Sequence, residues 1–121
     1  MTFQSLEFRI MKNPGYGVKE LHAELRNDGL HYQTFWTDGL DGGIVDHPQE
    51  WVKDLEKLNI TEWKQQYLGT NSIHSSWLLE YQDGTHHARI SGKDSCPESF
   101  SSLLNLMNRL SPDTNFRECL S

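Results

Sequence analysis

Two Asp-Gly dipeptides, at residues 28–29 and 83–84, each stand between two runs in which apolar and polar residues alternate. This arrangement is a strong signal for a β-hairpin, because both central residues of a type I′ turn need positive φ. The sequence therefore predicts one hairpin over residues 21–36 and a second over residues 73–90. Alternation places the apolar side chains of each hairpin on one face, as a core on a single side of the sheet requires.

The hairpins also predict which residues face each other, if Asp-Gly forms each two-residue loop. In the first hairpin three cross-strand pairs then face the core: Leu25 with Tyr32, Ala23 with Thr34 and Leu21 with Trp36. In the second hairpin three more do so: Tyr81 with His86, Leu79 with Ala88 and Trp77 with Ile90. On the opposite face this register pairs Glu80 with His87 and leaves Phe35 exposed beside His22.

Other segments predict further elements around the hairpins. Alternating apolar and charged residues predict a strand over residues 6–10. The glycine content of residues 37–46 predicts a loop. Apolar residues at helical spacing predict three helices, over residues 48–58, 61–67 and 97–110, the last opened by a proline.

Together these elements predict one α+β domain over residues 1–112 and a C-terminal tail over residues 113–121. The domain would contain an antiparallel sheet of about five strands packed by two or three amphipathic helices, in the chain order βββααββα. A chain of 121 residues is close to the usual size of one domain and can bury a core without disulfide staples.

The charge balance disfavours nucleic acid as a partner. The chain has 17 acidic and 11 basic side chains, a net charge of −6, whereas binding to a phosphate backbone needs clustered positive charge. No apolar run approaches the roughly 18 residues that cross a bilayer, and the first residues lack the features of a signal peptide. The sequence thus predicts a cytoplasmic protein, in which Cys96 and Cys119 are more often unpaired than bridged.

The acidic residues are densest between Asp38 and Glu62, where seven carboxylates stand against two lysines. Two interpretations remain open: a solvated loop and helix face, or a surface that attracts a basic partner. In the second interpretation the predicted contact residues are Asp38, Asp41, Asp46, Glu50, Asp54 and the exposed aromatic Phe35. The spacing of Asp38, Asp41 and Asp46 misses the ligand pattern of an EF-hand loop, so no metal site is predicted.

The chain contains no recognisable catalytic or cofactor-binding motif. It lacks a phosphate-binding loop, a dinucleotide fingerprint, a Gly-x-Ser-x-Gly elbow and a Cys-x-x-Cys pair, so no cofactor is predicted. One enzymatic alternative stays open, a cleft lined by histidine, Glu80 and Cys96, in which a cysteine just before a helix start gains from the helix dipole. His86 and His87 point to opposite faces of a strand, so they cannot both bind one metal ion without a bulge.

One pattern in the second half of the chain is familiar. It consists of Trp63 and Tyr67, the hairpin Trp77-x-Leu79-x-Tyr81-x-Asp83-Gly84, the loop from Gly92 to Pro97, and the residues Phe100, Leu103 and Leu104. The pattern resembles a signature of small, poorly characterised bacterial proteins, in which a tryptophan-bearing hairpin leads through a Gly-x-x-x-x-Pro loop into a terminal helix. The resemblance implies a bacterial origin and the order of hairpin, loop and helix, and it implies no activity.

The chain as a whole is small, acidic and without a catalytic constellation. In this profile it resembles bacterial immunity proteins, which neutralise a cognate toxin that is often a basic nuclease. The sequence therefore favours a non-catalytic protein-binding module over an enzyme. Its partner would be a cognate toxin or another basic protein, steered by the acidic residues and held by an aromatic anchor. The oligomeric state stays open, and so does a structural role through exposed strand edges.

Overall fold

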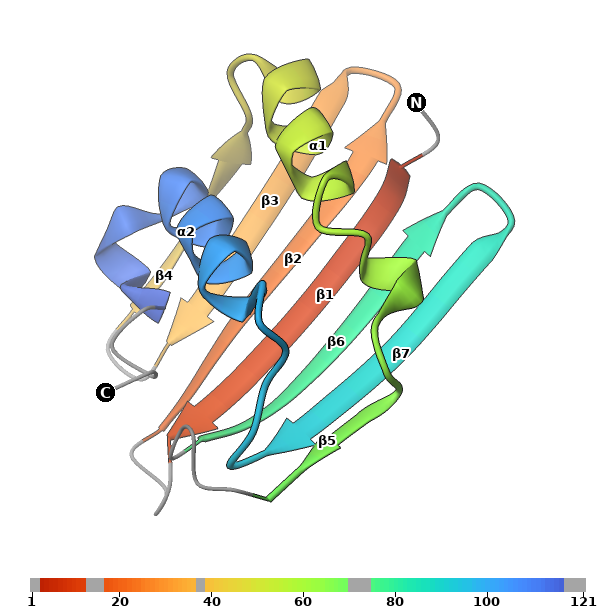
Figure 1. The fold of residues 1–121 in the computed structure, drawn as a ribbon. Coiled ribbons are helices and arrows are strands. Elements are labelled where there is room, and N and C mark those ends of the chain that lie inside the picture. Colours follow the sequence, from red (N-terminus) through yellow and green to blue (C-terminus); the bar gives the residue numbers. More distant parts are fainter. Residues whose placement is uncertain (1–2, 13–16, 37–38, 70–74, 117–121) are drawn as a thin grey trace.

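The computed structural model describes residues 3–12, 17–36, 39–69 and 75–116. In these residues a seven-stranded sheet is covered on one face by two α-helices (Figure 1). The strands are β1 (Phe3–Lys12), β2 (Val18–Arg26), β3 (Gly29–Trp36), β4 (Gly39–Ile44), β5 (Gln66–Leu68), β6 (Ser75–Asp83) and β7 (His86–Lys93). The helices are α1 (Pro48–Glu56) and α2 (Phe100–Leu110), with short 3-10 helices η1 (Ile60–Glu62) and η2 (Pro112–Thr114).

The strands lie in the order β4-β3-β2-β1-β6-β7-β5. Neighbours are antiparallel except β5 and β7, which are parallel. The first strand is central, because it pairs with β2 of one hairpin and with β6 of the other. The α+β class predicted from the sequence is confirmed, whereas the predicted five strands and the order βββααββα are wrong in detail.

Both hairpins form where the Asp-Gly dipeptides predict them, but each register differs by two residues from the predicted one. In the first hairpin Ala23 lies opposite Tyr32 and Leu21 opposite Thr34. The loop there is Asn27-Asp28, and Gly29 takes positive φ (139°) just after it. A hydrogen bond of 2.6 Å joins the His31 Nε2 and Asp28 Oδ1 atoms across this turn.

In the second hairpin the loop is Gly84-Thr85, and Gly84 has φ 58°, at the position where a type II′ turn takes glycine. The core-facing pairs are therefore Tyr81 with Ala88, Leu79 with Ile90 and Trp77 with Gly92, and on the other face Glu80 lies opposite Arg89 instead of His87. Because the side-chain period of a strand is two, a shift of two residues changes the partners but keeps every side chain on its predicted face.

The segment predicted as a glycine-rich loop contains an edge strand. Residues 39–44 form β4, which pairs with β3 and places Leu40 opposite Phe35 and Ile44 opposite His31. Glycine has a low strand propensity because it has no side chain to pack and loses much backbone entropy when it is ordered. Here the backbone pairing with the free edge of β3 outweighs that cost.

The helix predicted over residues 61–67 is also wrong. The chain makes only the turn η1, and β5 then pairs with β7. The Trp63 indole N–H donates to the Leu58 carbonyl over 2.9 Å, while the Tyr67 ring packs on Trp77 with centroids 6.0 Å apart. The two aromatics therefore serve different contacts instead of one helix face.

The last helix begins at Phe100, three residues later than the sequence predicts. The carbonyl of Pro97 accepts the Phe100 N–H over 3.1 Å, so proline precedes the helix rather than opening it. Cys96 consequently does not stand at a helix N-terminus, and the activation by a helix dipole that the sequence allows is absent.

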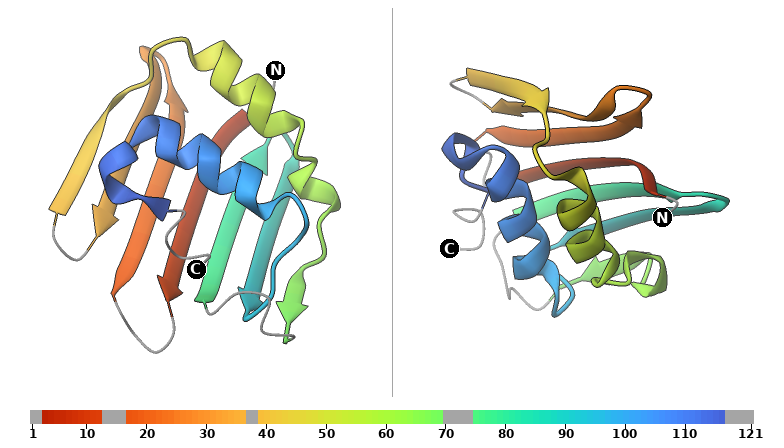
Figure 2. Two further views of the ribbon diagram at one scale, coloured as in Figure 1. Left: turned by 60° about the vertical axis from the view of Figure 1, so that its left-hand side comes forward. Right: turned by 90° about the horizontal axis from the view of Figure 1, so that it is seen from above.

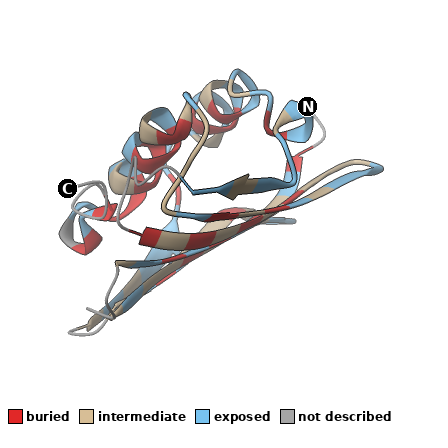
Figure 3. Cartoon of the chain, turned by 60° about the horizontal axis from the view of Figure 1, so that its bottom comes forward, coloured by how far each residue is buried: buried red, intermediate tan, exposed pale blue. Residues whose placement is uncertain are grey.

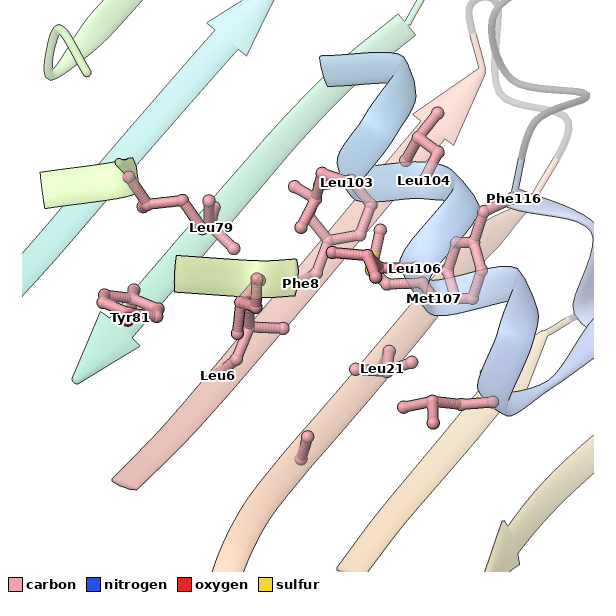
Figure 4. Close-up of a cluster of buried hydrophobic side chains, with 14 of the residues drawn as sticks. Leu6, Phe8, Leu21, Leu79, Tyr81, Leu103, Leu104, Leu106, Met107 and Phe116 are labelled. Carbon is pink, nitrogen blue, oxygen red and sulfur yellow. The ribbon is translucent and has the colours of Figure 1, made fainter. Parts of the chain in front are cut away.

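The core lies between the sheet and the two helices (Figures 2 and 4). Its buried side chains include Leu6, Phe8, Leu21, Leu79 and Tyr81 from the sheet, and Leu103, Leu104, Leu106, Met107 and Phe116 from α2 and the segment after it. Phe116 falls in the segment predicted as a tail, yet its side chain is fully buried and packs on Phe8. No helix in the described part of the chain is long and apolar enough to cross a membrane.

Residues of the familiar pattern meet in this core. The Trp77 ring lies 4.7 Å from the Phe100 ring between centroids, and its indole N–H donates to the Ser95 carbonyl over 2.9 Å. A Cβ on Gly92 would stand 2.2 Å from the Trp77 Nε1 atom, so only glycine fits below this indole. The tryptophan, the glycine and the helix start thus form one packing unit.

Candidate functional site

The side of the sheet away from α1 and α2 has no helix over it in the described structure (Figure 3). We call this side the open face. Its side chains alternate along each strand with those of the core: Glu7 and Arg9 of β1, for example, alternate with the buried Leu6, Phe8 and Ile10. A face of this kind is free to contact a ligand or a partner.

The centre of the open face carries a row of charged and polar residues on four neighbouring strands. The cross-strand partners in this row are Arg89 of β7, Glu80 of β6, Glu7 of β1 and His22 of β2. Arg89 Nη1 lies 3.3 Å from Glu80 Oε1, and His22 Nδ1 lies 3.1 Å from Glu7 Oε1. The register therefore sets two acidic residues, Glu7 and Glu80, directly opposite each other.

The contact between His22 and Glu7 is close but is not a hydrogen bond. The Nδ1 atom of His22 is shielded from solvent and has no hydrogen-bond partner among the residues that the structure describes. The 3.1 Å separation is therefore a contact of the ion-pair type whose alignment is poor, and alignment decides hydrogen-bond strength at this distance. Glu7 itself is largely exposed and can turn toward another cation.

A depression of about 310 Å³ lies over this row. The polar side chains that line it are Glu7, Glu80, His22 and the ion pair of Arg9 with Glu20. Phe35 and Leu78 supply apolar walls from β3 and β6. The depression thus offers several carboxylate oxygens beside apolar surface, which is the composition of a site that orients a polar group.

Exposed apolar side chains gather on the open face. Among the described residues, every large apolar side chain that is exposed belongs to this face except Leu25: Met11, Val18, Phe35, Leu40, Ile44 and Leu68. Phe35 is 45% exposed and lies opposite Leu40, which is 75% exposed. Apolar groups that share one surface indicate an interaction site more strongly than isolated ones do.

The described carboxylates predicted from the acidic segment lie on the helix side of the sheet. Asp46 and Glu50 are exposed on the helix side of the molecule and line a second depression of about 270 Å³. Asp41 lies opposite the buried Thr34, and its Oδ2 atom accepts a hydrogen bond from Ser111 over 3.2 Å. Asp38 lies outside the described residues.

Two further predicted residues, Asp54 and Phe35, lie on opposite sides of the sheet. Asp54 of α1 accepts a hydrogen bond of 2.9 Å from Arg109, and this guanidinium holds the pKa of the Asp54 carboxyl below its usual range. Lys57 lies 3.7 Å from the same carboxylate. Phe35 lies on the open face, on the other side of the sheet from Asp54. One flat partner surface therefore cannot contact both Asp54 and Phe35.

The groups named in the enzymatic alternative lie on different sides of the sheet. Glu80 and His22 line the same depression, whereas Cys96 is half-buried against the core on the helix side. His74 and Cys119 lie outside the described residues. No group of three or more His, Cys, Asp or Glu residues in the described ranges is placed to hold a metal ion.

Sequence reasoning missed Glu7, Arg9 and Leu78 as site residues. Alternation marks all three as solvent-facing positions, but a solvent-facing residue on a strand usually has no role beyond its contact with water. Their importance comes from the position of β1 between β2 and β6, which joins strands far apart in the chain. The isolated sequence carries no signal for that order.

No protein-family model matches this sequence, and no curated protein is significantly similar to it.

Proposed function

We propose that the protein is a non-catalytic binding module whose open face docks a basic protein partner, in the manner of an immunity protein that neutralises a nuclease-type toxin. The observation that carries the proposal is the gathering of exposed apolar side chains and carboxylates on the sheet face that neither helix of the described structure covers. Such a surface combines the two parts of a protein interface, apolar anchors and polar groups that set the register.

The net charge supports a basic partner. A chain of charge −6 attracts a cationic protein at long range and repels nucleic acid and other acidic proteins. Phe35 is the best-placed anchor, because it is a half-exposed aromatic ring at the edge of the depression. Aromatic anchors near the centre of an interface carry much of the binding energy, and they act mainly on the dissociation rate.

The open face is a better docking surface than the acidic segment that the sequence suggests. Asp41 and Asp54 are already engaged by Ser111 and Arg109, so less of the segment's charge is available to a partner. Asp46 and Glu50 remain, and they contribute to long-range attraction wherever the partner docks.

A second candidate function is a small enzyme or ligand-binding domain that uses the same depression. The observation that favours it is the placement of the His22 imidazole 3.1 Å from the Glu7 carboxylate, a pair that can act in acid–base catalysis. No cysteine is among the described residues that line the depression, so this candidate would not use Cys96 as a nucleophile.

The test compares the wild-type protein with two single variants in partner capture. Tagged wild-type protein is incubated with host lysate at low salt, and retained proteins are identified by mass spectrometry. We expect one stoichiometric basic protein, lost from Phe35→Glu and weakened by salt. Leu25→Glu is the matched control, because Leu25 is 43% exposed but lies off the open face.

The paired reversal Asp46→Lys with Glu50→Lys separates the open face from the acidic segment. If Phe35→Glu still captures the partner but the double variant does not, the interface lies on the helix side and not on the open face. Expression of the captured partner in a bacterial host then tests immunity: the partner alone should arrest growth, and co-expressed wild-type protein, but not Phe35→Glu, should restore it.

A further inference from the structure

We propose that the partner inserts an arginine side chain into the open-face depression, where its guanidinium bridges the carboxylates of Glu7 and Glu80. This inference rests on the proposed function, because it names the group that a basic partner presents to the open face. It makes the depression a recognition pocket for one cationic side chain.

The cross-strand pair of carboxylates is the first support. Residues directly opposite on antiparallel strands have Cβ atoms about 5 Å apart, and like charges in such a pair destabilise the sheet. Glu80 has a guanidinium beside it, that of Arg89 at 3.3 Å, whereas the neighbour of Glu7 is the imidazole of His22. Because the contact of His22 with Glu7 is not an aligned hydrogen bond, a cation from outside can pair with the Glu7 carboxylate more completely.

The walls of the depression favour arginine over lysine. Phe35 and Leu78 give the pocket apolar surface on two strands, β3 and β6. A guanidinium is planar, weakly hydrated, able to stack on such surface and able to bind two carboxylates at once, whereas an ammonium is compact and strongly hydrated. The lining guanidinium of Arg9 is paired with Glu20.

The same geometry disfavours a metal ion as the occupant. The depression contains carboxylates and an imidazole, yet no three such groups in the described chain converge as metal ligands. Two acidic side chains on neighbouring strands suit a forked organic cation, which can contact both carboxylates with its own N–H groups.

The test is a titration of the ¹⁵N-labelled full chain with N-acetyl-arginine methylamide, followed by amide chemical shifts. We expect saturable shifts around Glu7, His22 and Glu80, with a dissociation constant on the order of millimolar for so small a probe. The lysine analogue should bind more weakly, and the citrulline analogue, which is neutral and nearly isosteric, should cause no such shifts.

Two variants locate the probe. Glu7→Gln and Glu80→Gln should each weaken binding of the arginine probe by about threefold to tenfold. Glu24→Gln is the matched control, because Glu24 is on the same face, is paired with Arg26 and does not line the depression. The spectrum of each free variant shows whether its fold is intact.

Three results would overturn the inference: no saturable shifts, equal shifts with citrulline, or an equal loss of binding in Glu24→Gln. Its failure is distinguishable from failure of the proposed function. If lysate capture of a basic protein depends on Phe35 but not on Glu7 or Glu80, the docking face stands and the arginine pocket is wrong. If the arginine probe binds but no basic protein is captured, the pocket stands as a cation site and the docking function is wrong.

Discussion

Glu7 on β1 and Glu80 on β6 lie directly opposite each other at the centre of the open face. Folding therefore places two acidic residues at directly opposite positions of neighbouring strands, where a pair of opposite charges would be favourable and a pair of like charges is not. A pairing that disfavours the folded state and lies in a surface depression indicates a role outside stability, since functional sites are where local rules of stability are broken.

Replacing Glu7 by glutamine should raise stability, because it removes the repulsion with Glu80 and breaks no aligned hydrogen bond. We expect a gain of about 0.5 kcal/mol in the free energy of unfolding. Urea denaturation measures it. Glu80→Gln should show no such gain, because it also removes the Arg89 ion pair; a loss above about 1 kcal/mol in Glu7→Gln would show that the Glu7 carboxylate stabilises the fold.

Gly92→Ala should be strongly destabilising. The added methyl group would stand 2.2 Å from Trp77 Nε1 and 2.7 Å from the Ser95 carbonyl oxygen, so the indole must move away from its hydrogen bond. Overpacking of this kind costs about 1–3 kcal/mol, measurable by thermal and urea unfolding. Gly43→Ala is the control: its methyl would meet nothing closer than 3.6 Å, and stability should be unchanged or slightly higher.

Ser111→Ala should also lower stability, through the buried hydroxyls that join η2 to β3. Ser111 Oγ lies 3.1 Å from Thr34 Oγ1 and 2.7 Å from Thr114 Oγ1, and Ser111 also donates to Asp41. Its removal leaves two buried hydroxyls without this partner, at a cost of about 1–3 kcal/mol. If denaturation of Ser111→Ala matched wild type, this cluster would have no role in holding η2 against the sheet.

The ion pair between Asp54 and Arg109 predicts a pH effect. The pKa of the Asp54 carboxyl is lowered in the folded state, so its contribution to stability is present above the unfolded pKa and is lost as pH falls through the folded pKa. Arg109→Gln should raise the pKa of Asp54 toward its ordinary value and reduce the loss of stability in acid. Carboxyl ¹³C shifts followed against pH measure that pKa, and an unchanged value would contradict the assignment of its cause to Arg109.

The alternation around the Asp-Gly turns determined both hairpins and the face to which each of their side chains points. Those assignments needed only the period of a strand, and a register error of two residues left them intact. Periodicity also placed α1 and the apolar stripe of α2 correctly. The exposed position of Phe35 followed from the same local argument.

Tertiary structure alone decided the strand order, the two additional strands β4 and β5, and hence the site. A glycine-rich segment becomes a strand only because β3 presents a free edge, and Tyr67 enters a strand only because β7 lies beside it. The meeting of Glu7 with Glu80 requires β1 to lie between the hairpins. Such pairings depend on backbone hydrogen bonds between segments distant in the chain, and these bonds are nearly independent of side-chain identity, so the sequence carries little trace of them.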